Sequence, residues 1–269
     1  MRAAHAILDK FLRDRGTHLA AMVAYFALLS FVPLLFLALS LVGLTGDPNE
    51  SSYLIQELRR AFPTSSVDRL IEIVRQTQEH ATELGLVGAV GLIWGALGFF
   101  SVLESAFNIV YGLPNRPFLR QKLIVLLLVA VALVVLFVAL VVGSLGGELA
   151  KRAGVVAGVI ANVYSIALST ALILGFIWGV YRVLTNTQLT WRETLPGAAV
   201  AAVVVEASFQ ALPVFVHATH DLVALQAFGG LVLLLVWLYL MANVLVLGAE
   251  LNWWLANGKR AEETAAGLA

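Results

Sequence analysis

The stretch "LIVLLLVAVALVVLFVALVVGSLGG", from Leu123 to Gly147, runs for 25 residues without a charged side chain. A helix that crosses a bilayer needs about 20 mostly apolar residues. The strands of membrane barrels are shorter, about 10 residues, and alternate in polarity, whereas this stretch is uniformly apolar. It therefore predicts a transmembrane helix.

Five further apolar runs lie on either side of this stretch, and the one near residue 200 is interrupted only by Glu206. Each run is long enough to cross a bilayer. The sequence thus predicts an all-α fold, a polytopic bundle of six transmembrane helices that forms one integral membrane domain over residues 1–269. The expected spans are residues 20–44, 85–111, 123–146, 154–182, 195–216 and 228–254.

The composition supports a membrane protein and excludes several classes of function. Only 13% of the residues are charged, about half the usual share for a soluble domain, and the mean hydropathy is +0.90. The net charge is zero, which gives no electrostatic case for binding nucleic acid. The chain has no cysteine, so disulfides, thiolate metal sites and cysteine nucleophiles are excluded.

The connections between the spans carry an uneven distribution of lysine and arginine. If both termini are cytoplasmic, the inner segments hold eleven of these residues and the outer segments hold six. Cytoplasmic loops are normally the richer in positive charge. We therefore expect both termini on the cytoplasmic side.

Two segments outside the spans have amphipathic patterns. Residues 50–80 contain two helical patterns on the outer side, between the first and second spans, that predict a pair of helices over the bundle or in the headgroups. The opening "HAILDKFLRD" predicts a short interfacial helix, with Ile7 and Phe11 toward lipid and Lys10 and Arg13 toward headgroups.

Glycine pairs and one proline predict features of the packing. "GLIWG" (Gly91–Gly95), "GVVAG" (Gly154–Gly158) and "GFIWG" (Gly175–Gly179) have the spacing that lets membrane helices approach closely. Pro33 lies inside the first span and removes a backbone hydrogen bond. We expect a kink there, with the Ser30 hydroxyl bonding to the freed carbonyl.

Polar residues within the spans are the strongest functional signal, because charged groups near the centre of a bilayer are costly and tend to face the protein interior. Glu104 with Asn108, and Glu206 with Gln210, are each spaced to share a helix face. The sequence is compatible with two roles for these pairs: they line a substrate or proton path, or they form structural hydrogen bonds between helices. Glu104 and Glu250 lie near inner helix ends, where pairing with Arg116 or Arg182 is equally open. The candidate path residues are Glu104, Asn108, Glu206, Gln210, Asn243 and Glu250.

An enzymatic function has little support. In "HATHD", the side chains of His217, His220 and Asp221 are weak candidates for a metal site, since a solvated turn explains them as well. Metal-assisted hydrolysis of a phosphodiester needs several convergent carboxylates or histidines, and the chain offers no such cluster. We expect no enzyme activity and no cofactor.

Six strings follow one another along nearly the whole chain: "AYFALLSFVPLLFLALSLVGL" (Ala24–Leu44), "LESAFNIVYG" (Leu103–Gly112), "YRVLTN" (Tyr181–Asn186), "TWRETLPGA" (Thr190–Ala198), "WLYL" (Trp237–Leu240) and "LGAELN" (Leu247–Asn252). Together they resemble the YihY/BrkB family of bacterial inner-membrane proteins, which once carried the label ribonuclease BN. The resemblance implies six spans in the cytoplasmic membrane. One departure is Thr185, where the family often has proline.

These observations predict a transporter or flippase-like facilitator for a lipid-related amphiphile, in contact with membrane lipids. The alternative is a scaffold that does not transport and that recruits envelope-building partners. A membrane hydrolase is the least favoured interpretation. The sequence contains no phosphate-binding loop of the G-x-x-x-x-G-K-[ST] type, so ATP is not expected to drive transport. Homo-oligomers and envelope protein partners are both open.

Overall fold

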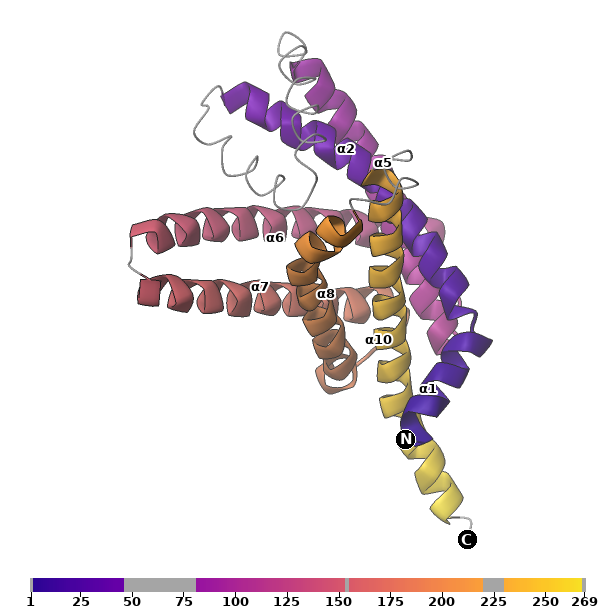
Figure 1. The fold of residues 1–269 in the computed structure, drawn as a ribbon. Coiled ribbons are helices and arrows are strands. Elements are labelled where there is room, and N and C mark those ends of the chain that lie inside the picture. The colour runs from indigo at the N-terminus through magenta and orange to yellow at the C-terminus, as the bar shows by residue number, and fades with distance from the viewer. Residues whose placement is uncertain (1, 46–80, 153–154, 220–229, 268–269) are drawn as a thin grey trace. The chain divides into compact units, whose positions relative to one another are not determined.

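The computed structural model describes residues 2–45, 81–152, 155–219 and 230–267. These ranges contain helices and no strand, as the all-α prediction requires. The outer amphipathic segment, residues 50–80, lies outside the described residues. The helices are α1 (Arg2–Arg13), α2 (Gly16–Thr45), α5 (Ala81–Tyr111), α6 (Phe118–Arg152), α7 (Val155–Leu184), α8 (Trp191–Thr219) and α10 (Gly230–Gly267) (Figure 1).

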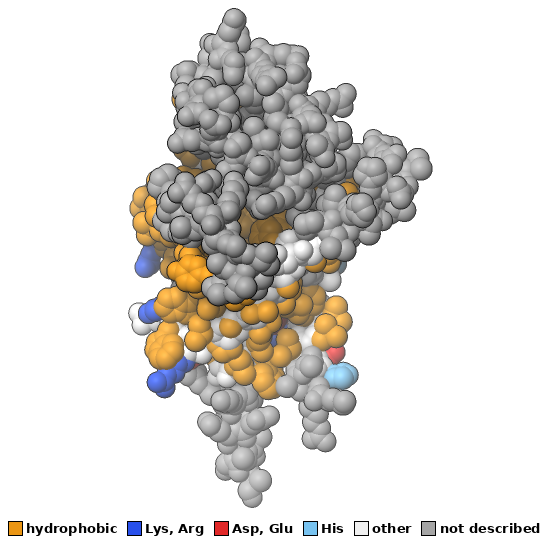
Figure 2. All heavy atoms as spheres, turned by 60° about the vertical axis from the view of Figure 1, so that its left-hand side comes forward, with side chains coloured by type: hydrophobic (Ala, Val, Ile, Leu, Met, Phe, Trp, Pro, Cys, Tyr) orange, Lys and Arg blue, Asp and Glu red, His pale blue; other side chains and the backbone are white. Residues whose placement is uncertain are grey.

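Five of these helices contain a segment that is long and apolar enough to cross a membrane. The segments have mean hydropathies between 1.3 and 2.4, and they are Gly85–Tyr111, Phe118–Val135, Ile166–Leu184, Trp191–Ala211 and Val232–Asn257. Many of their large apolar side chains point outward: Leu119 is 76% exposed and Trp94 is 68% exposed. Figure 2 shows apolar side chains over much of the described surface of one face.

Such a surface is stable in lipid and not in water, so these helices are those of a polytopic membrane protein. The sixth span expected within α2 stays a prediction.

The chain divides into two compact units, and each is described by itself. The first unit comprises Met1–Val23, Phe100–Ala207 and Leu240–Ala269. The second comprises Ala24–Phe99 and Ser208–Tyr239. The prediction of one integral domain is not tested by this division.

In the second unit, three glycines of α5 pack against α2. A Cβ atom at Gly91 would lie 3.1 Å from the Pro33 ring, and one at Gly95 would lie 3.0 Å from the Ser30 Cα atom. One turn away, Gly98 faces the ring of Phe26. The "GLIWG" pair therefore serves close packing, as predicted.

The prediction that the Ser30 hydroxyl bonds to the carbonyl freed by Pro33 is wrong. Its hydroxyl donates to the carbonyl of Phe26, at 2.9 Å, four residues back along α2. The carbonyl that Pro33 frees belongs to Leu29, since the bond runs from each N–H to the carbonyl four residues earlier. The hydroxyl of a serine in a helix bonds to the carbonyl four residues before that serine, which for Ser30 belongs to Phe26 and not to Leu29.

In the first unit, α6 and α7 pack side by side (Figure 1), and α8 crosses α10 at two glycines. A Cβ atom at Gly197 would overlap the carbonyl oxygen of Gly248, and one at Gly248 would overlap the Tyr181 hydroxyl. Only glycine fits at this crossing, because any side chain would push the two backbones apart. The crossing brings Asn252 within reach of α8, where its Oδ1 atom accepts from the Gly197 N–H at 2.7 Å.

Helix α1 does not lie as predicted. Phe11 is 4% exposed and packs against Gly16, whereas Leu8 and Leu12 are 51% and 57% exposed. Lys10 faces the protein, with 12% of its side chain exposed. The predicted orientation, with Phe11 toward lipid and Lys10 toward headgroups, is therefore wrong. Among the apolar side chains of α1, Phe11 is buried by its packing on Gly16, whereas Leu8 and Leu12 point outward.

Candidate functional site

Most of the buried polar residues of the first unit lie on the last turns of α5 and α7, on the first turn of α8 and on α10 near residue 250, where Lys10 of α1 contacts α5 and α10. We call this region the α1 end. The buried polar side chains there are 0–1% exposed, and they belong to Glu104, Asn108, Thr185, Thr194, Glu250 and Asn252. Charged groups with no exposure to water need ionic or hydrogen-bonding partners.

The α1 end is held in part by the connection between α5 and α6. Helix α5 stops at Gly112, which has a φ angle of 66°. The Leu113 N–H donates to the Asn108 carbonyl at 2.7 Å, and the Gly112 N–H donates to the Ile109 carbonyl at 3.0 Å. This is the Schellman pattern, in which glycine adopts the left-handed conformation without steric cost and Pro114 then prevents continuation of the helix.

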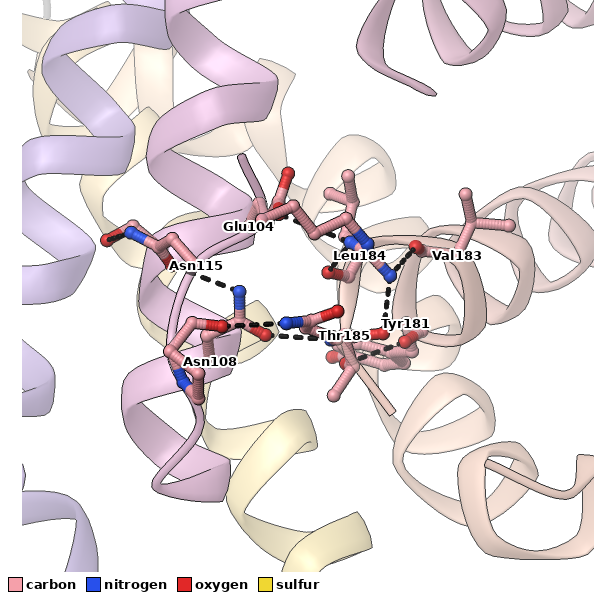
Figure 3. A network of polar contacts seen from close by, with 11 residues as sticks. Glu104, Asn108, Asn115, Tyr181, Val183, Leu184 and Thr185 are labelled. Carbon is pink, nitrogen blue, oxygen red and sulfur yellow. Dashed lines mark hydrogen bonds and ion pairs between the residues drawn. The ribbon is translucent and has the colours of Figure 1, made fainter. Parts of the chain in front are cut away.

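Arg116, in the same connection, binds buried Glu104 and the end of α7; Figure 3 labels its partners Glu104, Val183, Leu184 and Thr185. Its Nη1 atom lies 3.2 Å from Glu104 Oε1 and donates to the Leu184 carbonyl at 2.7 Å. Its Nη2 atom donates to the carbonyls of Val183, at 3.0 Å, and Thr185, at 2.9 Å. A cation at a helix C-terminus satisfies carbonyls that lack partners within the helix. The pairing of Glu104 with Arg116 that the sequence left open is thus present.

Asn108 joins the same two helix ends (Figure 3). Its Oδ1 atom accepts from the Asn186 N–H at 2.8 Å, and its Nδ2 atom donates to Asn115 at 3.0 Å. Asn186 also donates through its side chain to the Pro114 carbonyl, at 2.9 Å. These are the contacts of structural hydrogen bonding.

Thr185, the departure from the family pattern, also has a structural contact. Its hydroxyl donates to the Tyr181 carbonyl at 2.8 Å. The Tyr181 hydroxyl in turn donates to the Leu245 carbonyl of α10 at 2.7 Å, and its ring centroid lies 5.0 Å from that of Phe107. Sequence reasoning missed Tyr181, because an aromatic residue near the end of an apolar span has no distinguishing pattern.

Glu250 is paired with Lys10 of α1 and not with an arginine. Lys10 Nζ lies 2.8 Å from Glu250 Oε2 and 2.8 Å from the Val110 carbonyl oxygen, and it also binds Asp14. It lies over the Trp253 ring, 4.3 Å from the ring centroid. Sequence reasoning missed this contact; the available signal was that a buried carboxylate in α10 required a cation.

Glu206 lies in α8, is 8% exposed and accepts a hydrogen bond from the Ser169 hydroxyl of α7 at 3.0 Å. Gln210, one turn further on, is exposed, and Asn243 is half-buried. Within the first unit, Glu104, Asn108 and Glu250 belong to the α1 end, whereas Glu206 bonds to α7. Their role in a path stays a prediction.

The proposed metal ligands fall largely outside the described part of the chain. His217 belongs to α8, but its side chain is not described, and His220 and Asp221 lie outside the described residues. Within the described residues, no three histidine or acidic side chains are grouped as metal ligands would be.

The comparisons with known proteins agree with the arrangement of long apolar helices. The profile of the family described as "Virulence factor BrkB" matches residues 7–269, essentially the whole chain. Neither the search of curated proteins nor that of solved structures returns a match. The chain, a polytopic membrane protein, therefore belongs to the BrkB virulence factor family.

Proposed function

We propose that this protein is a transporter or flippase-like facilitator for a lipid-related amphiphile in the bacterial cytoplasmic membrane. The observation that carries the proposal is the position of Glu206. It follows Leu195 by eleven residues along α8, so at about 1.5 Å per residue it lies about 16 Å along the span. That distance is close to the middle of a hydrocarbon core about 30 Å thick.

An acidic residue at this depth carries a free-energy cost of insertion that a neutral side chain able to make the same hydrogen bond would avoid. Insertion scales assign about 2.5 to 3.5 kcal/mol to a charged residue at the helix centre. The Ser169 hydroxyl would bind an amide oxygen as well as it binds a carboxyl oxygen. A carboxyl group at this position therefore supports a role that an amide lacks, such as proton exchange or binding of a polar headgroup.

The test is lipid movement in proteoliposomes that contain the purified protein and a fluorescent phospholipid. Wild-type protein is expected to move the fluorescent lipid between leaflets, and Glu206→Gln should reduce the rate at least several-fold while leaving the protein folded. Asp9→Asn, at an exposed acid of α1, is the matched control and should behave as wild type. Equal rates for Glu206→Gln and wild type would remove the carboxyl group from the mechanism.

The alternative is a scaffold that does not transport, and one observation favours it. Glu104 and Asn108 are both engaged in contacts that hold helix ends together. A framework fastened in this way suits a protein that presents a fixed surface to partners. Folded wild-type protein that fails to move any lipid or ion in proteoliposomes would favour this alternative.

We also propose that both termini are cytoplasmic, in agreement with the distribution of lysine and arginine. This orientation places the α1 end on the cytoplasmic side of the membrane.

A further inference from the structure

The ammonium group of Lys10 contacts polar and aromatic groups from other parts of the first unit. Two carboxylates contribute, Asp14 of the following turn and Glu250 of α10, the latter with no exposed side-chain surface. The Val110 carbonyl, at the end of α5, accepts a hydrogen bond at 2.8 Å. The Trp253 ring covers the ammonium group at 4.3 Å from its centroid.

These are the groups that recognise a primary ammonium ion. Such an ion has three N–H donors, which here face a carbonyl and two carboxylates, and its positive charge is attracted to the face of an indole ring. The groups come from two helices, α5 and α10, and from the turn after α1, so they form a site that is built by the fold.

Lys10 binds only one of the two Glu250 oxygens. Its Nζ atom lies 2.8 Å from Oε2, whereas the buried Oε1 atom has no hydrogen-bond partner among the described residues. The backbone of α1 fixes the direction from which the Lys10 side chain enters. An ammonium group free of that tether can turn a donor toward this second Glu250 oxygen.

We propose that Glu250, Asp14, the Val110 carbonyl and Trp253 together form a binding site for a primary ammonium group, which Lys10 occupies in the absence of ligand. The ligand is a soluble primary amine or an amphiphile with a primary-ammonium headgroup. Its binding displaces Lys10 and thereby loosens α1. The site does not depend on whether the protein transports a lipid.

The test removes the Lys10 side chain from the site and adds a small primary ammonium ion in its place. Lys10→Ala removes the ammonium group and leaves Glu250 without its cation. Ethylammonium chloride should then raise the midpoint of thermal unfolding of this variant by about 3 °C or more, as expected for a ligand that binds only the folded state. Tetramethylammonium chloride at the same concentration has no N–H donor and should not.

Two control variants separate this effect from a general effect of amines. Lys122 donates to Ser101 at 2.9 Å and lies over the Phe118 ring, and among the described residues no carboxylate forms an ion pair with it. Lys122→Ala should therefore gain nothing from ethylammonium. The double variant Lys10→Ala with Glu250→Gln should also gain nothing, because its site lacks the buried charge.

If Lys10→Ala does not fold by itself, the same comparison is made on the yield of folded protein purified in each salt. Equal yields, or equal unfolding midpoints, in ethylammonium and tetramethylammonium would overturn the proposal and leave Lys10 as an ordinary ion-pair partner.

The source of the ammonium group is tested with the same variant in vesicles. One set contains phosphatidylethanolamine in phosphatidylcholine, and the other contains phosphatidylcholine alone. Protection by phosphatidylethanolamine would identify a lipid headgroup as the ligand, whereas protection by free ethylammonium alone would identify a soluble amine.

Discussion

Replacing Arg116 with alanine should destabilise the protein more than any other single change in the connection between α5 and α6. The Arg116 side chain is 10% exposed, and it binds a fully buried carboxylate together with three carbonyl groups at the end of α7. Alanine would leave the Glu104 charge without its cation. It would also remove three hydrogen bonds that close the last turn of α7.

The magnitude follows from these contacts. Breaking a buried ion pair by removing one partner costs about 3–5 kcal/mol. The bonds to the three carbonyls would each contribute about 1.5 kcal/mol if they were independent. Contacts of one side chain are not additive, so we expect about 4 kcal/mol for Arg116→Ala. Glu104→Gln retains an acceptor for Arg116 and should cost about 1–2 kcal/mol.

The assay is a double-mutant cycle, with the free energy of unfolding measured for each variant in detergent micelles. If the charge of Glu104 carries much of the cost, Glu104→Gln should relieve part of the damage caused by Arg116→Ala. The coupling free energy is then expected to be about 2 kcal/mol. A cost below about 1 kcal/mol for Arg116→Ala, or a coupling near zero, would show that Arg116 and Glu104 do not stabilise one another.

Three further changes test other parts of the structure. Gly248→Ala should cost about 2 kcal/mol or more in unfolding free energy, because its methyl group would overlap the Tyr181 hydroxyl. Gly175→Ala should be neutral or slightly stabilising, because an added Cβ atom there meets no atom of a neighbouring described segment within 4 Å; equal effects would contradict the close packing of Gly248 on Tyr181. Gly112→Ala should cost about 1 kcal/mol by forcing alanine to a φ angle of 66°, and Gly112→Asn should cost less; identical unfolding midpoints for all three proteins would count against the helix-end assignment. Single cysteines at His5 and Glu262 should resist a membrane-impermeant thiol reagent in intact cells, while one at Ser66 should react; labelling at either end would reverse the proposed orientation.

The positions of the helices were largely predictable, because an uncharged apolar run has few alternatives to a membrane helix. Their ends were not. Helix α10 extends to Gly267 although its span was expected to end at residue 254, and α6 extends to Arg152 although residue 146 was expected. An apolar run marks where a helix is in lipid, whereas alanine, glutamate and lysine beyond it continue the helix in water.

The site was predictable where its contacts are local. Arg116 follows Glu104 by 12 residues across one short connection, so their pairing was foreseeable. The partner of Glu250 was not, because no sequence spacing relates Lys10 to α10. The apolar stripe of α1 contains Ile7, Leu8, Phe11 and Leu12, and only the packing of Phe11 on Gly16 decides which half is buried.

The ion pairs of Glu104 and Glu250 also differ in when their two partners are synthesised. The ribosome synthesises Glu104 and then Arg116 only 12 residues later, so the charge of α5 is matched within one helical hairpin, before α7 exists. Lys10 is synthesised first, and every intervening helix is synthesised before Glu250, its partner. The first pair can therefore form while the chain is still being inserted, whereas the second can close only when the last helix is in place, which makes it a marker of completed assembly.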